Sequence, residues 1–277
     1  MMPIYIILSI IVFILLLNTT IIKSIIYHLS NNLKTSGFFS YYYVYKEIFI
    51  DDTYGFLPIK DNMVIFDVGA NIGLYNLYAN TKAKNLKVYS FEPIKDIFDC
   101  MEHNVNKNKI RIKNNNENIL INKGLGESNK VITMNYIKDA SALSSGCEFD
   151  ENKLEAHNSI YKEKCGIFHN ICKDYLETRL KNPLKVKGSI TTIDDIIAKY
   201  QIKNIDILKI DVECYEYQVL QGISIDNFKL IQNIILEIEN FRENNKNNII
   251  RVLQNNNFII NYNTNIKDNW ITIYAYR

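Results

Sequence analysis

The chain has 277 residues, of which 47% are hydrophobic and 22% are charged, so most of it can build a globular core. Its 32 Lys and Arg residues nearly balance 30 Asp and Glu residues, and the net charge of +2 argues against a nucleic-acid partner. Ten Gly and four Pro residues exclude collagen-like and proline-rich classes. The cysteines contain no CxxC pair, so neither a zinc site nor a disulfide framework is expected. They are Cys100, Cys147, Cys165, Cys172 and Cys214.

The first apolar run predicts a membrane anchor. Residues 4–17 read IYIILSIIVFILLL, and the run extended to Ile22 has 19 residues. As a helix it would span roughly 28 Å, about the thickness of a bilayer core. A cleaved signal peptide and a buried core helix are the alternatives. However, no Lys or Arg precedes the run, no small-residue cleavage site follows it, and it has no polar face. Residues 1–30 are therefore expected to form an uncleaved, single-pass anchor.

The distribution of basic residues predicts which side of the membrane holds the rest of the chain. Lys23, Lys34 and Lys46 follow the apolar run, and the positive-inside rule then places the globular part in the cytosol. Cysteines interpreted as free thiols agree with a reducing compartment. We therefore expect a membrane protein with a cytosolic domain.

The remaining chain divides into an aromatic segment and an alternating α/β domain. Residues 31–62 predict one or two helices that cover the main domain. Residues 63–277 alternate between short apolar runs and amphipathic stretches, which is typical of βαβ units in a mostly parallel, doubly wound sheet. Residues 147–185 have no clear pattern, and the last two runs are expected to form an edge hairpin. The expected strands are 63–68, 87–92, 118–122, 205–212, 230–239, 258–262 and 270–276, with a further strand that begins at 130. The expected helices are 72–83, 94–106, 216–223, 247–256 and, after a cap at Thr191 or Thr192, the one within 190–200.

A glycine-containing loop follows the first strand of this domain. Residues 66–73 read FDVGANIG, with Gly69 and Gly73 on either side of Asn71. Small residues allow a tight turn and a close approach to a ligand, and Asn tolerates the left-handed conformation. The loop is not the G-x-G-x-x-G of dinucleotide-binding folds, and an ordinary strand-to-helix turn is the alternative.

Acidic residues close the second and fourth expected strands. Glu92 lies 19 residues after Gly73, where an acid can accept hydrogen bonds from ribose hydroxyls; an acid that caps the helix after Pro93 is the alternative. Asp211 ends the strand 205–212, and ligands of such sheets lie beyond the carboxyl ends of the strands. Glu213 and Glu216 are three residues apart and can face one side of the next helix, although acids at a helix start are common without a ligand.

These motifs, in this order and spacing, resemble the FkbM family of methyltransferases. The resemblance covers about residues 63–240 and rests on DVGANIG, FEP, the TTIDD segment and IDILKIDVE followed by VLQG and IILEIE. It implies a class I methyltransferase fold that uses S-adenosylmethionine (SAM), typically for O-methylation of sugars or related hydroxyl compounds. By this resemblance, Asp67, Gly69, Asn71 and Gly73 line the methionine end of SAM and Glu92 holds its ribose. Ser144 and Ser145 fall in a loop that precedes the substrate region.

The expected reaction is an in-line transfer of the methyl group to a hydroxyl of a glycan or small molecule. Since an alcohol is a weak nucleophile, a nearby base should help, and Asp211 is the first candidate and Glu213 the second. Glu237 near the end of the fifth strand can orient the substrate, as can Glu216. The carboxylates could hold a divalent metal, but no ligand spacing demands one.

Three other functions stay open at this stage. A protein or an RNA could be the methyl acceptor, and an NAD-binding enzyme could share the fold. A membrane-tethered module that has lost turnover is the third, because the family usually has Gly where this chain has Cys214. A side chain at that position could narrow the site.

Overall fold

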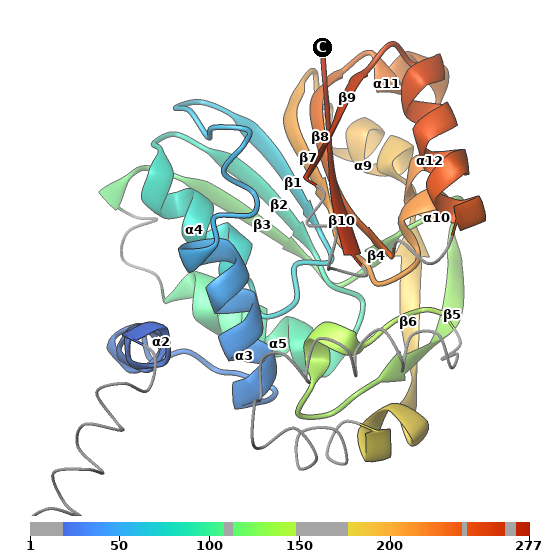
Figure 1. Ribbon diagram of the computed structural model, residues 1–277. Helices are drawn as coiled ribbons and strands as arrows, with labels where there is room; N and C mark the ends of the chain where they lie inside the picture. Colours follow the sequence, from blue (N-terminus) through green and yellow to red (C-terminus); the bar gives the residue numbers. More distant parts are fainter. Residues whose placement is uncertain (1–18, 108–112, 148–176, 240–242, 264–269) are drawn as a thin grey trace, which may run out of the picture.

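A seven-stranded sheet runs through the centre of the protein (Figure 1). The computed structural model describes residues 19–107, 113–147, 177–239, 243–263 and 270–277. The strand order is β3-β2-β1-β7-β8-β10-β9, in which the first five strands are parallel and β10 is antiparallel to both of its neighbours. The strands are β1 (Val64–Val68), β2 (Lys87–Phe91), β3 (Glu117–Ile121), β7 (Ile205–Ile210), β8 (Ile231–Glu239), β9 (Ile259–Asn263) and β10 (Trp270–Tyr276). The expected mostly parallel α/β fold with an edge hairpin is confirmed.

Helices cover both faces of this sheet (Figure 1). Because side chains alternate along a strand, β1 sends Ile65 into one core and Phe66 and Val68 into the other. The first core packs under α2 (Thr19–Ser30), α3 (Phe38–Tyr45), the π-helix η1 (Lys46–Ile50), α4 (Leu74–Lys82) and α5 (Lys95–Asn106). The second packs under α9 (Ile193–Tyr200), α10 (Glu216–Gln221), α11 (Ile225–Phe228) and α12 (Glu243–Asn255).

A second, smaller sheet stands beside the carboxyl edge of the first. It contains β4 (Gly124–Leu125), β6 (Leu184–Thr191) and β5 (Lys130–Tyr136), in that order, and the short 3-10 helix η2 (Ser141–Leu143) follows β5. The helix expected after a cap at Thr191 or Thr192 is confirmed, because Thr192 caps α9 by accepting a hydrogen bond from the Asp195 amide. Ile190 and Thr191 end β6 instead of belonging to the helix. The β-branched run of Ile190 and Thr191 suits the strand.

The predicted single-pass membrane placement is overturned. Residues 4–17 lie outside the described part of the chain, and within that part no helix combines the length and apolar character needed to cross a bilayer. The end of the predicted span falls in α2, which has 12 residues and packs on protein. Tyr41 donates its hydroxyl to the Ser24 carbonyl, and Tyr27 packs against the rings of Tyr45 and Phe49. One side of α2 therefore packs on protein, whereas Ile22, Ile25, Ile26 and Leu29 are exposed.

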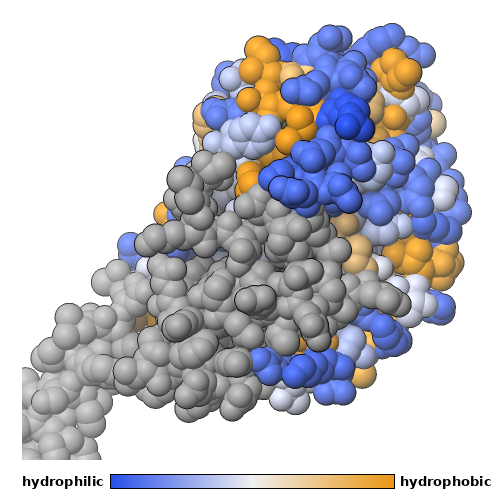
Figure 2. Space-filling view, turned by 45° about the vertical axis from the view of Figure 1, so that its right-hand side comes forward, coloured by the Kyte–Doolittle hydropathy of each residue, from blue (hydrophilic) through white to orange (hydrophobic). Residues whose placement is uncertain are grey.

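Eleven large apolar side chains are exposed among the described residues, and four of them belong to α2. On the face that Figure 2 presents, the coloured residues are largely hydrophilic, with hydrophobic ones in separate patches. Outside α2, this distribution is expected when most apolar side chains of an element face one of the two cores.

Candidate active site

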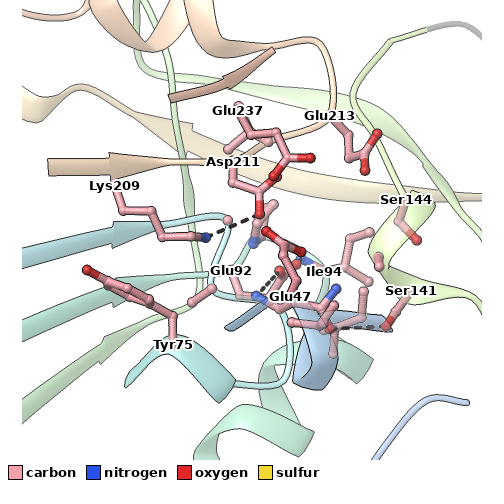
Figure 3. Close-up of a pocket in the computed structure, with 18 of the residues that line it drawn as sticks. Glu47, Tyr75, Glu92, Ile94, Ser141, Ser144, Lys209, Asp211, Glu213 and Glu237 are labelled. Carbon is pink, nitrogen blue, oxygen red and sulfur yellow. Dashed lines mark hydrogen bonds and ion pairs between the residues drawn. The ribbon is translucent and has the colours of Figure 1, made fainter. Parts of the chain in front are cut away.

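A cavity opens at the carboxyl ends of β1, β2, β7 and β8, with about 790 Å³ of empty space that includes open solvent. Its walls come from the loop after β1, the ends of β2, β7 and β8, the region of η2, and α3 and η1 from the N-terminal segment. Figure 3 shows several carboxylates together in this space. The polar lining residues are Glu47, Asn71, Tyr75, Glu92, Ser141, Ser144, Lys209, Asp211, Glu213 and Glu237.

The loop after β1 is tightly folded at one wall of the cavity. Gly69 has φ +79°, and a Cβ on it would lie 1.8 Å from the Asp211 carbonyl oxygen, so only Gly fits. Asn71 also adopts a left-handed conformation, with φ +48°. Gly73 has φ +86° and caps α4, but its added Cβ would meet Met101 and Val105 of α5 at 3.0 Å. Gly73 therefore serves helix packing and is not among the residues that line the cavity.

The backbone amides of this loop are already used inside the protein. Gly69 and Ala70 donate to the Phe91 carbonyl, Asn71 to Glu92, Ile72 to its neighbour Asn71, and Gly73 to the Ala70 carbonyl. A dinucleotide fold needs such amides for a pyrophosphate. Since SAM contains no phosphate, the loop fits SAM better than NAD.

Glu92 lies at the end of β2 with 6% of its surface exposed. Its two carboxylate oxygens accept hydrogen bonds from the amides of Asn71 and Ile94. Burial raises the pKa of Glu92 to about 7, although these amides oppose the shift. Each oxygen keeps a lone pair for a further donor, as a ribose diol would supply.

Lys209 brings a buried cation to the floor of the site. Its ammonium group lies 3.3 Å from a carboxylate oxygen of Asp67 and 3.3 Å from one of Asp211, and it packs over the rings of Tyr54 and Tyr75 at 5.3 and 5.6 Å. Burial opposes the charge on Lys209, but the two aspartates outweigh it and raise the pKa of the ammonium. Asp67 is fully buried and supports Lys209 rather than lining the cavity.

Three carboxylates meet above Lys209. Glu47 from η1, Asp211 and Glu237 each place an oxygen within 4.8 Å of the others, close enough to share a proton or a cation. The Tyr54 hydroxyl donates to Glu47 and lies 3.3 Å from Asp211 and 3.4 Å from Glu237. Burial, followed by the charge of Asp211, raises the pKa of Glu47. Burial, followed by the charge of Glu47, raises the pKa of Glu237 strongly.

Of the remaining predicted residues, some line the cavity and others are buried behind its lining. Glu213, with φ +54°, and Ser144 line the cavity. The Ser144 hydroxyl accepts a hydrogen bond from the Ile137 amide. Ser145 is buried and pairs with Asn135 through backbone hydrogen bonds. Glu216 is 1% exposed and accepts a hydrogen bond from the Cys214 amide. Neither Ser145 nor Glu216 reaches the cavity lining.

Cys214 departs from the sequence-based expectation. It forms a disulfide with Cys147, so the expectation of free thiols is wrong for this pair; Cys165 and Cys172 lie outside the described residues. Cys214 has φ +89°, which explains why Gly suits this position. Its side chain is buried and absent from the cavity lining, so the narrowing of the site that the sequence suggested as a possibility does not occur.

Sequence reasoning missed several residues of the site. Glu47, Tyr54 and Tyr75 belong to segments interpreted as packing, and only the fold brings them to Asp211. Ser141 donates its hydroxyl to the Asn71 side chain. Lys209 was detectable, because a lysine inside an apolar strand must find a partner when buried.

The family profile described as the methyltransferase FkbM domain matches residues 67–260, which is more than half of the chain. The chain belongs to the FkbM methyltransferase family. Its methyl donor is SAM, and this family assignment removes the NAD-binding enzyme from the alternatives. The loop that lacks free amides and the buried Glu92 beside it agree with this cofactor.

Curated relatives lie at moderate identity. Methyltransferase sdnD of Sordaria araneosa is 28% identical over 70% of this chain and 73% of its own length. The 31-O-demethyl-FK506 methyltransferase FkbM of Streptomyces tacrolimicus is 26% identical over 71% of this chain and 74% of its own. The hexuronic acid methyltransferase AglP of Haloferax volcanii is 23% identical over 65% of this chain, which covers 57% of that relative.

Proposed function

We propose that this FkbM methyltransferase transfers the methyl group of SAM to a hydroxyl of a sugar or a related polyhydroxy compound. The observation that carries the proposal is the cluster of Glu47, Asp211 and Glu237 beside the SAM loop, because carboxylates accept hydrogen bonds from hydroxyls and can take their protons. The names of two relatives support it: one is a 31-O-demethyl-FK506 methyltransferase, and the other is a hexuronic acid methyltransferase.

Bound SAM supplies a methyl group on a positively charged sulfur. Glu92 would hold its ribose, and the loop of Gly69 and Asn71 would lie against its methionine end. The acceptor oxygen would form a bond to the methyl carbon as the carbon–sulfur bond breaks, and the electrons of the carbon–sulfur bond would stay on sulfur. The product is S-adenosylhomocysteine, so no external oxidant or reductant is needed.

Asp211 would remove the proton from the acceptor hydroxyl. Its carboxylate lies directly after β7, 3.3 Å from the Lys209 ammonium. Glu213 is the second candidate for the base, and Glu237 would orient the acceptor by accepting a hydrogen bond from another hydroxyl. A positioned base contributes about 10²–10⁴-fold in rate.

The Asp211→Asn variant tests the assignment of the base. We expect kcat to fall by about 10²–10⁴-fold because the amide accepts no proton, while SAM affinity stays within about threefold of the wild-type value. The measurement is single-turnover methyl transfer from isotopically labelled SAM to a panel of sugar alcohols and glycosides. Unchanged turnover in this variant would show that another group is the base.

Calorimetric titration with SAM separates cofactor binding from chemistry. We expect Glu92→Ala to weaken SAM binding by at least about tenfold, because the ribose hydroxyls lose a buried partner. Tight SAM binding without transfer to any hydroxyl acceptor would instead favour a protein or RNA acceptor, or a module without turnover.

A further inference from the structure

Glu47 reaches the site from outside the family match. The match covers residues 67–260, whereas Glu47 belongs to η1, which precedes β1. Its carboxylate nevertheless meets those of Asp211 and Glu237, and Figure 3 shows the three side chains converging. The N-terminal segment thus adds an acid to a site whose other acids belong to the matched domain.

The position of Glu47 is held by its neighbours. Ile48, the next residue, is 3% exposed in the core, and the buried Tyr54 donates its hydroxyl to the Glu47 carboxylate. Tyr54 in turn packs edge-on against Tyr75, with ring centroids 5.3 Å apart. A carboxylate held in this way acts on a ligand without first losing side-chain freedom.

The cavity lining offers many hydrogen-bond acceptors and little positive charge that is free to pair with a ligand. Among the described residues that line it, Lys209 is the only cation, and its ammonium already faces Asp67 and Asp211. Glu47 and Glu237 present carboxylate oxygens on the same side. A ligand that donates hydrogen bonds suits this wall, whereas a ligand carboxylate would meet like charges.

We propose that Glu47 makes the acceptor pocket selective for uncharged polyhydroxy compounds over the same compounds carrying a carboxylate. This inference rests on the proposed function, because it concerns the acceptor of the same methyl transfer. Neighbouring hydroxyls of the acceptor would donate to Glu47 and Glu237 while Asp211 takes the proton of the reacting hydroxyl. Glu47 is thereby a specificity-determining residue.

The electrostatics of the free site support this selectivity. Burial and the negative charge of Asp211 raise the pKa of Glu47, and burial and Glu47 raise that of Glu237. Both shifts come first from burial and second from a neighbouring carboxylate, so an excess of negative charge is already unfavourable in the free site. A further anion would add to that excess, whereas a hydroxyl would not.

Matched pairs of acceptors test the proposal. Each pair consists of a methyl hexoside and the corresponding methyl hexuronide, in the gluco, galacto and manno series. We expect kcat/KM of the wild-type protein to be at least about tenfold higher for the hexoside than for the hexuronide. We expect the hexoside also to bind at least about tenfold more tightly to the protein loaded with S-adenosylhomocysteine. Glu47→Gln keeps the shape and removes the charge, and we expect it to reduce this preference about tenfold while SAM affinity is unchanged.

Two variants serve as controls. Glu102→Gln removes an exposed carboxylate on α5 and should leave the ratio unchanged. Glu237→Gln should shift the ratio in the same direction as Glu47→Gln, which keeps the test valid if the latter fails to fold. A hexuronide preference in the wild type, an unchanged ratio in both pocket variants, or failure of every hexoside to bind would overturn the proposal. If the wild-type protein does not bind SAM, the proposed function is overturned instead.

Discussion

The ammonium group of Lys209 lies between two aspartates in the floor of the site. Asp67 is fully buried, and neither of its carboxylate oxygens accepts a hydrogen bond among the described residues, so the ion pair with Lys209 at 3.3 Å is its main compensation. Removing one partner of a buried pair leaves an uncompensated charge. Burial accordingly raises the pKa of Asp67, although Lys209 opposes that shift.

We expect Lys209→Met to lower the free energy of unfolding by about 3–5 kcal/mol, because the Asp67 charge is left unpaired. Urea denaturation at neutral pH measures the loss. Adding Asp67→Asn to Lys209→Met should recover part of it, while Lys203→Met, at an exposed position, should stay within about 0.5 kcal/mol of the wild type. A loss below about 1 kcal/mol in Lys209→Met would contradict the role of this pair.

At the scale of elements, a disulfide ties two walls of the site together. Cys147 follows the η2 region that contributes Ser141 and Ser144, and Cys214 lies in the turn between β7 and α10 that contributes Glu213. Their Cα atoms are 6.4 Å apart, and 67 residues separate them in sequence. A cross-link over such a separation restricts the unfolded chain strongly.

Reduction of this bond should therefore lower the free energy of unfolding by about 2–4 kcal/mol. The double variant Cys147→Ser, Cys214→Ser should show the same loss in the absence of reductant, and Cys100→Ser, which removes a free thiol, should not. Peptide mapping under non-reducing conditions identifies the bond directly. Free thiols at Cys147 and Cys214, or a pairing with other cysteines, would refute the prediction.

At the scale of the whole molecule, buried carboxyls should set the pH dependence of stability. Burial raises the pKa of Glu92 to about 7 and that of Glu216 to about 8, against an ordinary value of 4.5. Between about pH 4.5 and 8 the folded state then binds more protons than the unfolded state, so stability falls as pH rises. The exposed Asp195 and Asp226 have lowered pKa values and act oppositely, since their contribution is lost only under more acidic conditions.

We expect the free energy of unfolding to fall by about 6 kcal/mol between pH 5 and pH 8, measured by urea denaturation at several pH values. Glu216→Gln should flatten this decline, because the amide cannot ionise. The matched control Glu102→Gln, at an exposed position, should keep the slope of the wild type. A stability that rises over this range would contradict the burial of these carboxyls.

Much of the fold was predictable because short apolar runs identify buried parallel strands. The β7 strand, Ile205–Ile210, was expected at 205–212, and β2, Lys87–Phe91, at 87–92. The start of α9 agrees with the expected cap at Thr191 or Thr192. The strand β6 was not predicted, because its pairing with β5 joins segments far apart in the chain. The apolar run near the N-terminus was ambiguous, because α2 packs on protein through Ser24 and Tyr27 while Ile22, Ile25 and Ile26 stay exposed.

The sequence by itself determined the family, the glycine-containing loop after β1 and the acids at the strand ends, because these lie in local motifs whose spacing follows from one βα turn. Asp211, Glu92 and Gly69 could be found in this way. Only the tertiary structure decided that Glu47 and Tyr54 join Asp211 and that Cys147 joins Cys214, since these contacts link residues far apart in the chain. Long-range contacts depend on how whole elements pack, and no local pattern encodes them.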